Sequence, residues 1–237
     1  MKTILYCLLF AVMGTQSFAQ KVIEKQFAYQ DQVIDLDVSF ARTITVNSWD
    51  KPNVYFKASI NIEDPQFLTY YKVDFEETNG LITIREAAGP LFEAMRDYGR
   101  KNDAGNRCYW YNTGDICQFH YVLYVPKNAT VQLESINGDL SSENLIGNFK
   151  TALVNGDIEL STYAGNLNLE TVNGTIDLKV DDVSFTAKTV NGDIYANENL
   201  AMTIYDKNVG QRIESTEQDH STQLRLNTVN GNMYLRK

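Results

Sequence analysis

Short runs of β-branched and aromatic residues alternate with polar residues along most of the chain, and helical periodicity is almost absent. Runs such as Ile44–Val46 and Val54–Ala58 are divided by turn-forming residues, while Val73–Phe75 and Leu81–Ile84 flank an Asn-Gly pair. Alternation bounded by Asn, Gly and Pro is typical of β-strands and hairpins. The pattern therefore predicts an all-β protein.

An internal repeat of eighteen residues occupies the C-terminal half. Asn-Gly pairs recur four times at this spacing, and a fifth pair follows 39 residues later, with a degenerate turn at Asn208-Val209-Gly210 between them. The five pairs are Asn137-Gly138, Asn155-Gly156, Asn173-Gly174, Asn191-Gly192 and Asn230-Gly231. A repeat of this length indicates a stacked architecture.

Aliphatic residues form two columns around these turns. The first column directly precedes each Asn and contains Ile136, Val154, Val172, Val190 and Val229. The second column lies three residues after each Asn and contains Leu140, Ile158, Ile176, Ile194 and Met233. An antiparallel meander fits the turn spacing, but it does not require the same residue type in every second strand.

In a parallel β-solenoid, by contrast, equivalent residues stack about 4.8 Å apart, so that like lies on like. We therefore predict a single parallel β-solenoid in which both columns belong to one inner stack. The Asn side chains are expected to form a hydrogen-bonded ladder along one corner. Each following Gly would permit the left-handed backbone that a tight corner needs.

The first nineteen residues have the character of a signal peptide. Lys2 precedes an uncharged apolar segment from Ile4 to Gly14, and Ser17-Phe18-Ala19 provides a cleavage site of the small-x-small type. Such a segment directs export and is then removed, so we expect a mature chain that starts at Gln20 and lies in the periplasm or outside the cell. No later stretch approaches the roughly 20 apolar residues of a transmembrane helix.

The mature chain, residues 20–237, is expected to form one domain with three parts. N-terminal strands occupy residues 20–86, an insertion occupies 87–119, and the repeat coils occupy 120–237. Within the insertion, Pro90–Arg96 has the pattern of a short helix, and residues 99–106 have that of a loop. Because the chain is exported, the closely spaced Cys108 and Cys117 predict a disulfide.

Three consecutive aromatic residues, Tyr109, Trp110 and Tyr111, lie between these cysteines. Exposed rings held by a disulfide would stack on a sugar or anchor in a protein pocket, which makes them the candidate ligand contact. The alternative is that the rings cover an open end or a side of the solenoid, where bare strand edges would otherwise aggregate.

Charge and motif content argue against several classes of function. The formal net charge of −9 disfavours nucleic acid, since phosphate contacts require basic patches. No nucleophile elbow, zinc-protease helix or phosphate-binding glycine loop occurs, and His120 and His220 stand alone. Asp139, Asp157 and Asp193 follow Asn-Gly pairs, but Thr175 and Asn232 interrupt the series. These aspartates are expected to bond to turn backbone rather than to calcium, and no cofactor is expected.

Several segments resemble the bacterial putative-adhesin family of β-strand-repeat proteins. They are the repeated S/T-V-N-G-D-I turns, the segment Tyr124–Val131 and the segment Thr43–Asp50. Members resemble auto-transporter adhesin heads, and the resemblance implies a β-helical fold over nearly the whole mature chain. The family has no agreed catalytic or binding residues to transfer, and residues 87–119 depart from its pattern.

We therefore predict a non-enzymatic interaction module of the cell envelope or surface, with an envelope protein or a glycan as its partner. One alternative is a carbohydrate-active enzyme on a β-helix, which would need carboxylates within reach of one bond. The other is a structural envelope component that associates with itself through the ends of its coils.

Overall fold

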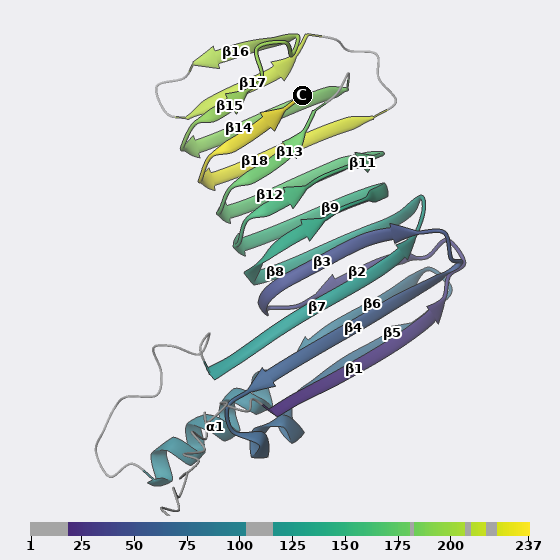
Figure 1. The fold of residues 1–237 in the computed structure, drawn as a ribbon, viewed down its shortest axis with the longest axis vertical. Helices are drawn as coiled ribbons and strands as arrows, with labels where there is room; N and C mark the ends of the chain where they lie inside the picture. The colour runs from purple at the N-terminus through teal and green to yellow at the C-terminus, as the bar shows by residue number, and fades with distance from the viewer. Residues whose placement is uncertain (1–18, 103–115, 181–182, 207–209, 217–221) are drawn as a thin grey trace, which may run out of the picture.

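The chain forms two facing β-walls that are stacked along one axis, with a helix at one end (Figure 1). The computed structural model describes residues 19–102, 116–180, 183–206, 210–216 and 222–237. Within these ranges nineteen strands belong to one hydrogen-bonded sheet, accompanied by one α-helix and one 3-10 helix. The predicted all-β class is confirmed.

We call the two walls A and B. In hydrogen-bonded order, wall A contains β5 (Lys72–Glu77), β6 (Leu81–Ala87), β2 (Val33–Asp37), the first half of β8 (Ala129–Ser142), β9 (Leu145–Asn155), β12 (Leu167–Asn173), β18 (Gln223–Asn230), β14 (Ser184–Asn191), β17 (Gln211–Ser215) and β16 (Met202–Asp206). Wall B contains β1 (Ala19–Ala28), β4 (Asn53–Ile62), β7 (Cys117–Pro126), β3 (Phe40–Trp49), the second half of β8, β10 (Ile158–Leu160), β13 (Ile176–Lys179), β19 (Met233–Arg236) and β15 (Ile194–Ala196).

The repeat coils pass from wall A to wall B at the Asn-Gly corners. Strand β8 makes this passage at Gly138, whose φ is 122°. In wall B, Ile158 pairs in parallel with Leu140 on one side and with Ile176 on the other, each eighteen residues away. A short third side is formed where β11 (Tyr163–Ala164) pairs with the start of β9. Equivalent residues of these coils therefore lie directly above one another.

The last repeat does not lie at the end of the stack. Strand β18 pairs in parallel with β12 on one side and with β14 on the other, so it lies between the third and fourth coils (Figure 1). Strand β19 lies in the same way between β13 and β15. The sequence predicted a degenerate corner near Asn208 that continues the series, and this is wrong. Gly210 instead lies in the turn of an antiparallel hairpin, β16–β17, while Asn208 and Val209 are outside the described residues.

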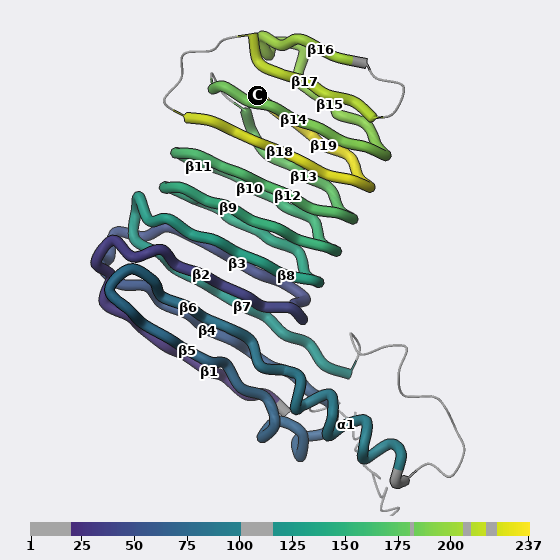
Figure 2. The backbone as a smooth tube through the Cα atoms, turned by 180° about the vertical axis from the view of Figure 1, so that it is seen from behind, coloured from purple at the N-terminus to yellow at the C-terminus, as the bar shows by residue number. Residues whose placement is uncertain are grey.

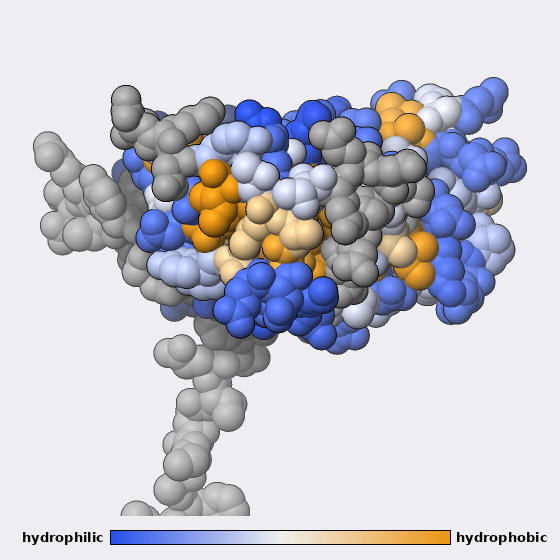
Figure 3. Space-filling view, turned by 90° about the horizontal axis from the view of Figure 1, so that it is seen from above, coloured by the Kyte–Doolittle hydropathy of each residue, from blue (hydrophilic) through white to orange (hydrophobic). Residues whose placement is uncertain are grey.

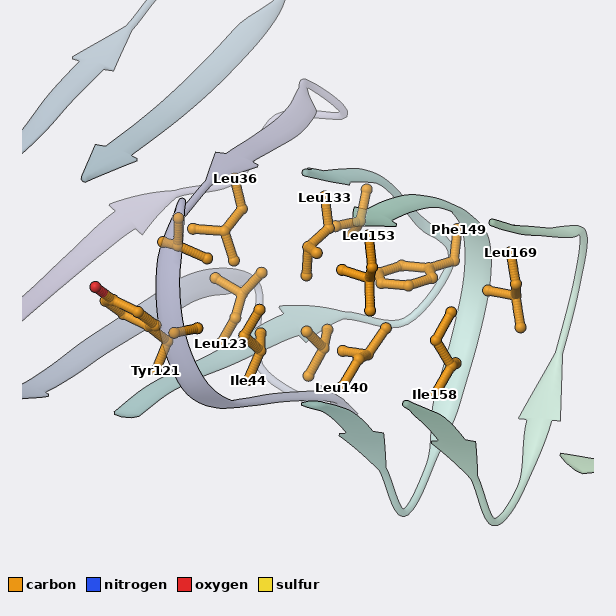
Figure 4. Close-up of a cluster of buried hydrophobic side chains, with 14 of the residues drawn as sticks. Leu36, Ile44, Tyr121, Leu123, Leu133, Leu140, Phe149, Leu153, Ile158 and Leu169 are labelled. Carbon is orange, nitrogen blue, oxygen red and sulfur yellow. The ribbon is translucent and has the colours of Figure 1, made fainter. Parts of the chain in front are cut away.

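The second aliphatic column forms the inner stack, as predicted. Leu140 and Ile158 are buried beside Phe149 and Leu169 in the space between the walls (Figure 4), and Ile176, Ile194 and Met233 continue the column. Each of these side chains alternates with an outward polar neighbour along its strand. Burial of this continuous apolar stack is the main favourable contribution to stability of the fold.

The first aliphatic column is outside the core, which corrects the prediction. Ile136, Val154, Val172, Val190 and Val229 are 39–46% exposed. The buried corner residue is instead the one before it, which is Ser or Thr in four of the five coils. Thr171 Oγ1 donates to the carbonyl of Gly156 at 2.9 Å, and Thr228 Oγ1 donates to that of Gly174 at 3.0 Å. The hydroxyls thus satisfy corner carbonyls of the neighbouring coil.

The N-terminal strands extend both walls beyond the repeats. β2 adds to β8 in wall A. In wall B, β3 adds to β8 and β7 adds to β3, both in parallel, and β4 and β1 follow in antiparallel pairing. At this end the 3-10 helix η1 (Pro65–Tyr70) and helix α1 (Gly89–Asn102) lie beside the strands (Figure 2). Leu91 of α1 is fully buried in the core. Neither described helix has the length and apolar character needed to cross a membrane.

The other end of the stack is covered on wall A by the β16–β17 hairpin. β17 pairs antiparallel with β14, and β16 is the outermost strand. Seen from above, this end carries apolar surface bordered by polar residues (Figure 3). Ile204 and Tyr205 of the outermost strand, β16, are exposed. The antiparallel hairpin ends the parallel stacking of wall A.

Two predictions for the insertion are corrected in part. Helix α1 continues to Asn102, so residues 99–102 are helical rather than a loop. Cys117 begins β7 and is buried, and its Sγ lies 3.8 Å from Met95 Sδ. Burial raises the pKa of this thiol to about 12. Cys108 and residues 1–18 of the predicted signal peptide lie outside the described residues, so the disulfide is not confirmed and both features stay predictions.

Candidate functional site

Three aromatic rings meet on the outer face of wall B, and we call them the aromatic cluster. They come from adjacent strands: Trp49 ends β3, Tyr124 lies near the end of β7, and Tyr55 lies opposite Tyr124 on β4. The centroids of Trp49 and Tyr124 are 5.2 Å apart with the rings stacked at 26°. Tyr55 lies 6.2 Å from Trp49 and 6.3 Å from Tyr124.

Strand alternation places these rings outside. Their neighbours Ser48, Leu123 and Phe56 point inward and are buried, so the three rings point to the opposite face and stay partly exposed. Separations of 4.5–7 Å are those at which aromatic pairs attract each other, by about 0.5–1.5 kcal/mol beyond the area that they bury. The cluster is therefore a preformed aromatic surface on a rigid sheet.

The turn after β3 fixes the orientation of the indole. Trp49 Nε1 donates to the carbonyl of Asn53 at 2.8 Å, which locks the ring across the turn. Lys51 Nζ lies 4.5 Å from the centroid of the Trp49 ring, and Asp50 forms a 2.6 Å ion pair with Lys127. An exposed cation–π contact is worth about 0.5–1 kcal/mol, so an incoming ligand can displace Lys51 from the ring.

A carboxylate borders the cluster. Partial burial, followed by a hydrogen bond to Glu24, raises the pKa of the Tyr55 hydroxyl. Glu24 on the edge strand β1 also lies 3.7 Å from Lys57 Nζ. Aromatic faces for apolar contact, beside a carboxylate that accepts hydrogen bonds and a lysine that donates them, suit a ligand with both C–H and O–H surfaces. A sugar ring has both.

The aromatic cluster is not the ligand contact that the sequence predicted. Tyr109, Trp110 and Tyr111 are outside the described residues, so their role as a ligand contact stays a prediction. The Asn residues form the predicted ladder: Asn155 Nδ2 donates to Asn137 Oδ1 at 3.1 Å, and matching bonds join Asn173 to Asn155, Asn230 to Asn173, and Asn191 to Asn230. Their amides are occupied by one another and serve the stack.

Two of the three corner aspartates, Asp139 and Asp157, bond to backbone as predicted, whereas Asp193 Oδ2 accepts from the Tyr195 hydroxyl at 3.4 Å. The amide N–H of Asp157 donates to Asp139 Oδ1 at 3.0 Å, and that of Thr175 donates to Asp157 Oδ1 at 2.6 Å. In the described part of the chain, no group of three or more His, Cys, Asp or Glu side chains is arranged to hold a metal ion. The carboxylates of Asp139 and Asp157 therefore cap the neighbouring coil.

One partly buried carboxyl, Glu86, has a strongly shifted pKa. Burial raises the pKa of Glu86 to about 7, against the lowering effect of its hydrogen bonds. The backbone N–H of Phe40 donates to its Oε2, and the hydroxyl of Tyr121 donates to its Oε1, both at 2.7 Å. Tyr121 is itself 2.8 Å from the hydroxyl of Tyr71. Both carboxyl oxygens are thus engaged by the protein, so Glu86 fixes the N-terminal core rather than facing a substrate.

His120 has an equally local role. Its Nδ1 lies 2.8 Å from Thr43 Oγ1 on the neighbouring strand, and burial, followed by the charge of Arg42, lowers its pKa.

The sequence did not single out the aromatic cluster, although Trp49 and Tyr55 both occur in runs that alternate. They lie beside Tyr124 because β7 pairs with β3 on one side and with β4 on the other, and no local sequence pattern predicts this pairing.

This architecture of stacked coils with Asn-Gly corners defines a β-solenoid-like class of protein. Residues 126–236 match the family model Toastrack DUF4097. The crystal structure of a putative cell adhesion protein from Clostridium sporogenes is similar at 10% identity, with a TM-score of 0.56 over 92% of this chain and 99% of that one. A putative adhesin from Bacteroides fragilis matches at 8% identity, with a TM-score of 0.41 over 90% of this chain and 96% of that one. No curated protein was found to match the sequence.

The match to this family model covers residues 126–236, and it agrees with the adhesin-like resemblance predicted from the sequence. The likeness to the Clostridium sporogenes protein concerns the fold, which it shares over nearly the whole length of both chains.

Proposed function

We propose that this protein is an exported, non-enzymatic interaction module that binds a glycan of the cell envelope or surface through the aromatic cluster. The observation that carries the proposal is the contact of Trp49, Tyr55 and Tyr124 on one rigid, outward face. Such rings present area for stacking at little cost in conformational entropy, because the sheet already holds them.

Other features support an interaction module. The fold is shared with a protein described as a putative cell adhesion protein, and the family likeness is to adhesin-like proteins. The predicted signal peptide would bring the module to the envelope. The alternative of a carbohydrate-active enzyme requires a pair of free carboxyl groups across one bond, whereas Glu86 and the corner aspartates use their oxygens within the protein.

A glycan array probed with the mature chain tests the proposal. We expect binding to one glycan class that weakens at least about tenfold in Trp49→Leu and Tyr124→Leu, because each change keeps apolar bulk but removes a stacking ring. Tyr195→Leu is the matched control, since Tyr195 also stacks on the outer face of wall B, with its ring 5.2 Å from that of Tyr234.

Two results would contradict the proposal. One is that both cluster variants retain the full affinity of the unaltered chain while their thermal melting shows a normal fold. The other is that the bound glycan is cleaved, which chromatography of the incubated glycan would reveal as shorter products.

A further inference from the structure

A groove crosses the repeat coils on wall A, away from the aromatic cluster. It has a volume of about 420 Å³ and runs over the starts of β8, β9, β12, β18 and β14. Buried Phe149, Leu167 and Phe185 lie beneath it. Since neighbouring strands are about 4.8 Å apart, a groove over five strands suits an extended ligand that lies along the stack axis.

The border of the groove is a row of amides. Asn166 Nδ2 donates to Asn148 Oδ1 at 3.1 Å, and the backbone N–H of Gln223 donates to Asn166 Oδ1 at 2.9 Å. These bonds hold the row in register across three coils. The groove therefore has a fixed polar margin on the outer face of wall A, and the buried apolar side chains lie on the inner face of the same strands.

Two cationic side chains of the groove lie at a fixed distance from each other. Lys150 and Arg225 both pair in register with Asn168, one on each side, so they are two strand spacings, or about 10 Å, apart. Both are exposed, and neither has an ion-pair partner among the described residues. No Asp or Glu occurs among the described residues that line the groove, although the chain carries a net charge of −9.

Asn168 lies between the two cations, and its side-chain oxygen Oδ1 is a hydrogen-bond acceptor. Its Nδ2 donates to Glu170 Oε1 at 3.3 Å, one step further along the strand. Its Oδ1 is buried and has no hydrogen-bond partner in the described part of the chain. A buried acceptor without a donor costs free energy, so binding is favoured when the Asn168 side chain turns and brings Oδ1 to the groove, where a ligand hydroxyl donates to it.

We propose that this groove is a second binding site and that it takes a linear acidic glycan, a chain of sugars that carry carboxylates. Lys150 and Arg225 bind carboxylates two coils apart, and Asn168 Oδ1 accepts a sugar hydroxyl between them. Hydroxyls distinguish this ligand from an acidic peptide. Single-stranded nucleic acid would need exposed rings to stack on its bases, but Phe149 and Phe185 are buried beneath the groove.

Polygalacturonate is the probe, and its fully methyl-esterified form is the matched neutral ligand. We expect titration calorimetry of the mature chain to show binding of the acidic polymer that weakens with salt. Lys150→Gln and Arg225→Gln should each reduce the affinity about tenfold or more, as expected for loss of a charged hydrogen bond. Lys188→Gln is the control, because Lys188 is an exposed cation of wall A outside the groove lining.

The site is overturned if the esterified polymer binds as tightly as the acid, if both groove variants bind normally, or if polyglutamate competes equally well. Because Lys150 and Arg225 are exposed, normal melting temperatures are expected for both variants. Trp49→Leu should leave polygalacturonate binding unchanged, so that failure of the groove and failure of the aromatic cluster are separate results.

Discussion

At the scale of single residues, the Asn-Gly corners combine three close contacts. The Asn amides bond along the stack, the buried hydroxyl before them meets a glycine carbonyl, and the glycines themselves lie against each other. A β-carbon on Gly174 would lie 2.0 Å from the carbonyl oxygen of Gly156, although the φ of Gly174 is not positive. Close approach, rather than a left-handed backbone, is thus what requires glycine at this corner.

Gly174→Ala should therefore destabilise the chain. The β-carbon overpacks the corner, and such overpacking costs about 1–3 kcal/mol. Gly80→Ala is the control, because a β-carbon there meets nothing within 4 Å and alanine reduces the entropy of the unfolded chain. Urea unfolding of both variants measures the difference. Equal midpoints for the two would show that the corner tolerates a side chain.

Glu86 makes a pH-dependent contribution to stability. Its pKa is raised to about 7 in the folded chain from 4.5, so the folded state holds the proton more tightly. The stabilisation is complete below pH 4.5 and is lost as the pH rises to about 7. Urea unfolding at pH 5 and pH 8 should thus show a free energy of unfolding that is greater at pH 5, by up to about 3 kcal/mol from this group.

Glu86→Gln provides the comparison for this pH effect. Glutamine cannot titrate, so the difference between pH 5 and pH 8 should shrink, while the contributions of the other carboxyl groups remain. Asp37 is the charged neighbour that also raises the pKa of Glu86, and it stays in place in the variant. An unchanged difference between the two pH values would assign the effect to other groups.

At the scale of elements, strand alternation predicted the inner column at Leu140 and Ile158 but not the outward position of Val154. In the second coil Leu153 and Ile158 point inward, and the four residues between them all lie on the convex corner. Along a straight strand, side chains alternate between the inner and outer faces, and a sharp corner interrupts this alternation. Alternation counted through an Asn-Gly turn therefore assigns the wrong face.

The order of the coils was not predictable from the repeat. Every coil presents the same Asn, Gly and aliphatic columns to its neighbours. The pairing edge of β12 therefore suits β14 as well as it suits β18, which is the strand that occupies it. The residue types in the columns specify that the coils stack, but they do not specify the order of the coils along the stack. For the same reason the aromatic cluster was missed, since it depends on which distant strand lies beside β3.

Paired cysteines test the coil order directly. In a chain that carries Cys108→Ser and Cys117→Ala, the double variant Asn173→Cys/Asn230→Cys should form a disulfide, because the two positions are paired neighbours. Asn173→Cys/Asn191→Cys should not, because β18 separates them and two strand spacings, about 10 Å, exceed the reach of a disulfide. Mass spectrometry without reduction reads both outcomes. A disulfide in the Asn173→Cys/Asn191→Cys variant alone would contradict this order and support a stack in which the coils follow one another in chain order.

At the scale of the whole molecule, the two walls separate two kinds of surface. Wall B carries the aromatic cluster at its N-terminal end, and wall A carries the cationic groove over the coils. The edge strand β1 includes Lys21, Glu24 and Lys25, charges that discourage pairing with another chain. Self-association through the coil ends remains a hypothesis, for which Ile204 and Tyr205 on β16 are the apolar contact surface.

The position of β18 and β19 also has a kinetic meaning. Solenoids usually fold by propagation, in which each new repeat adds to the one made just before it. Here propagation from β12 stops, because its next neighbour lies 57 residues further along the chain. The fourth coil must wait for the last strands, and closing so long a loop raises the contact order and slows folding. Until those strands arrive, the chain exposes two unpaired strand edges, and in this period it is most prone to aggregate.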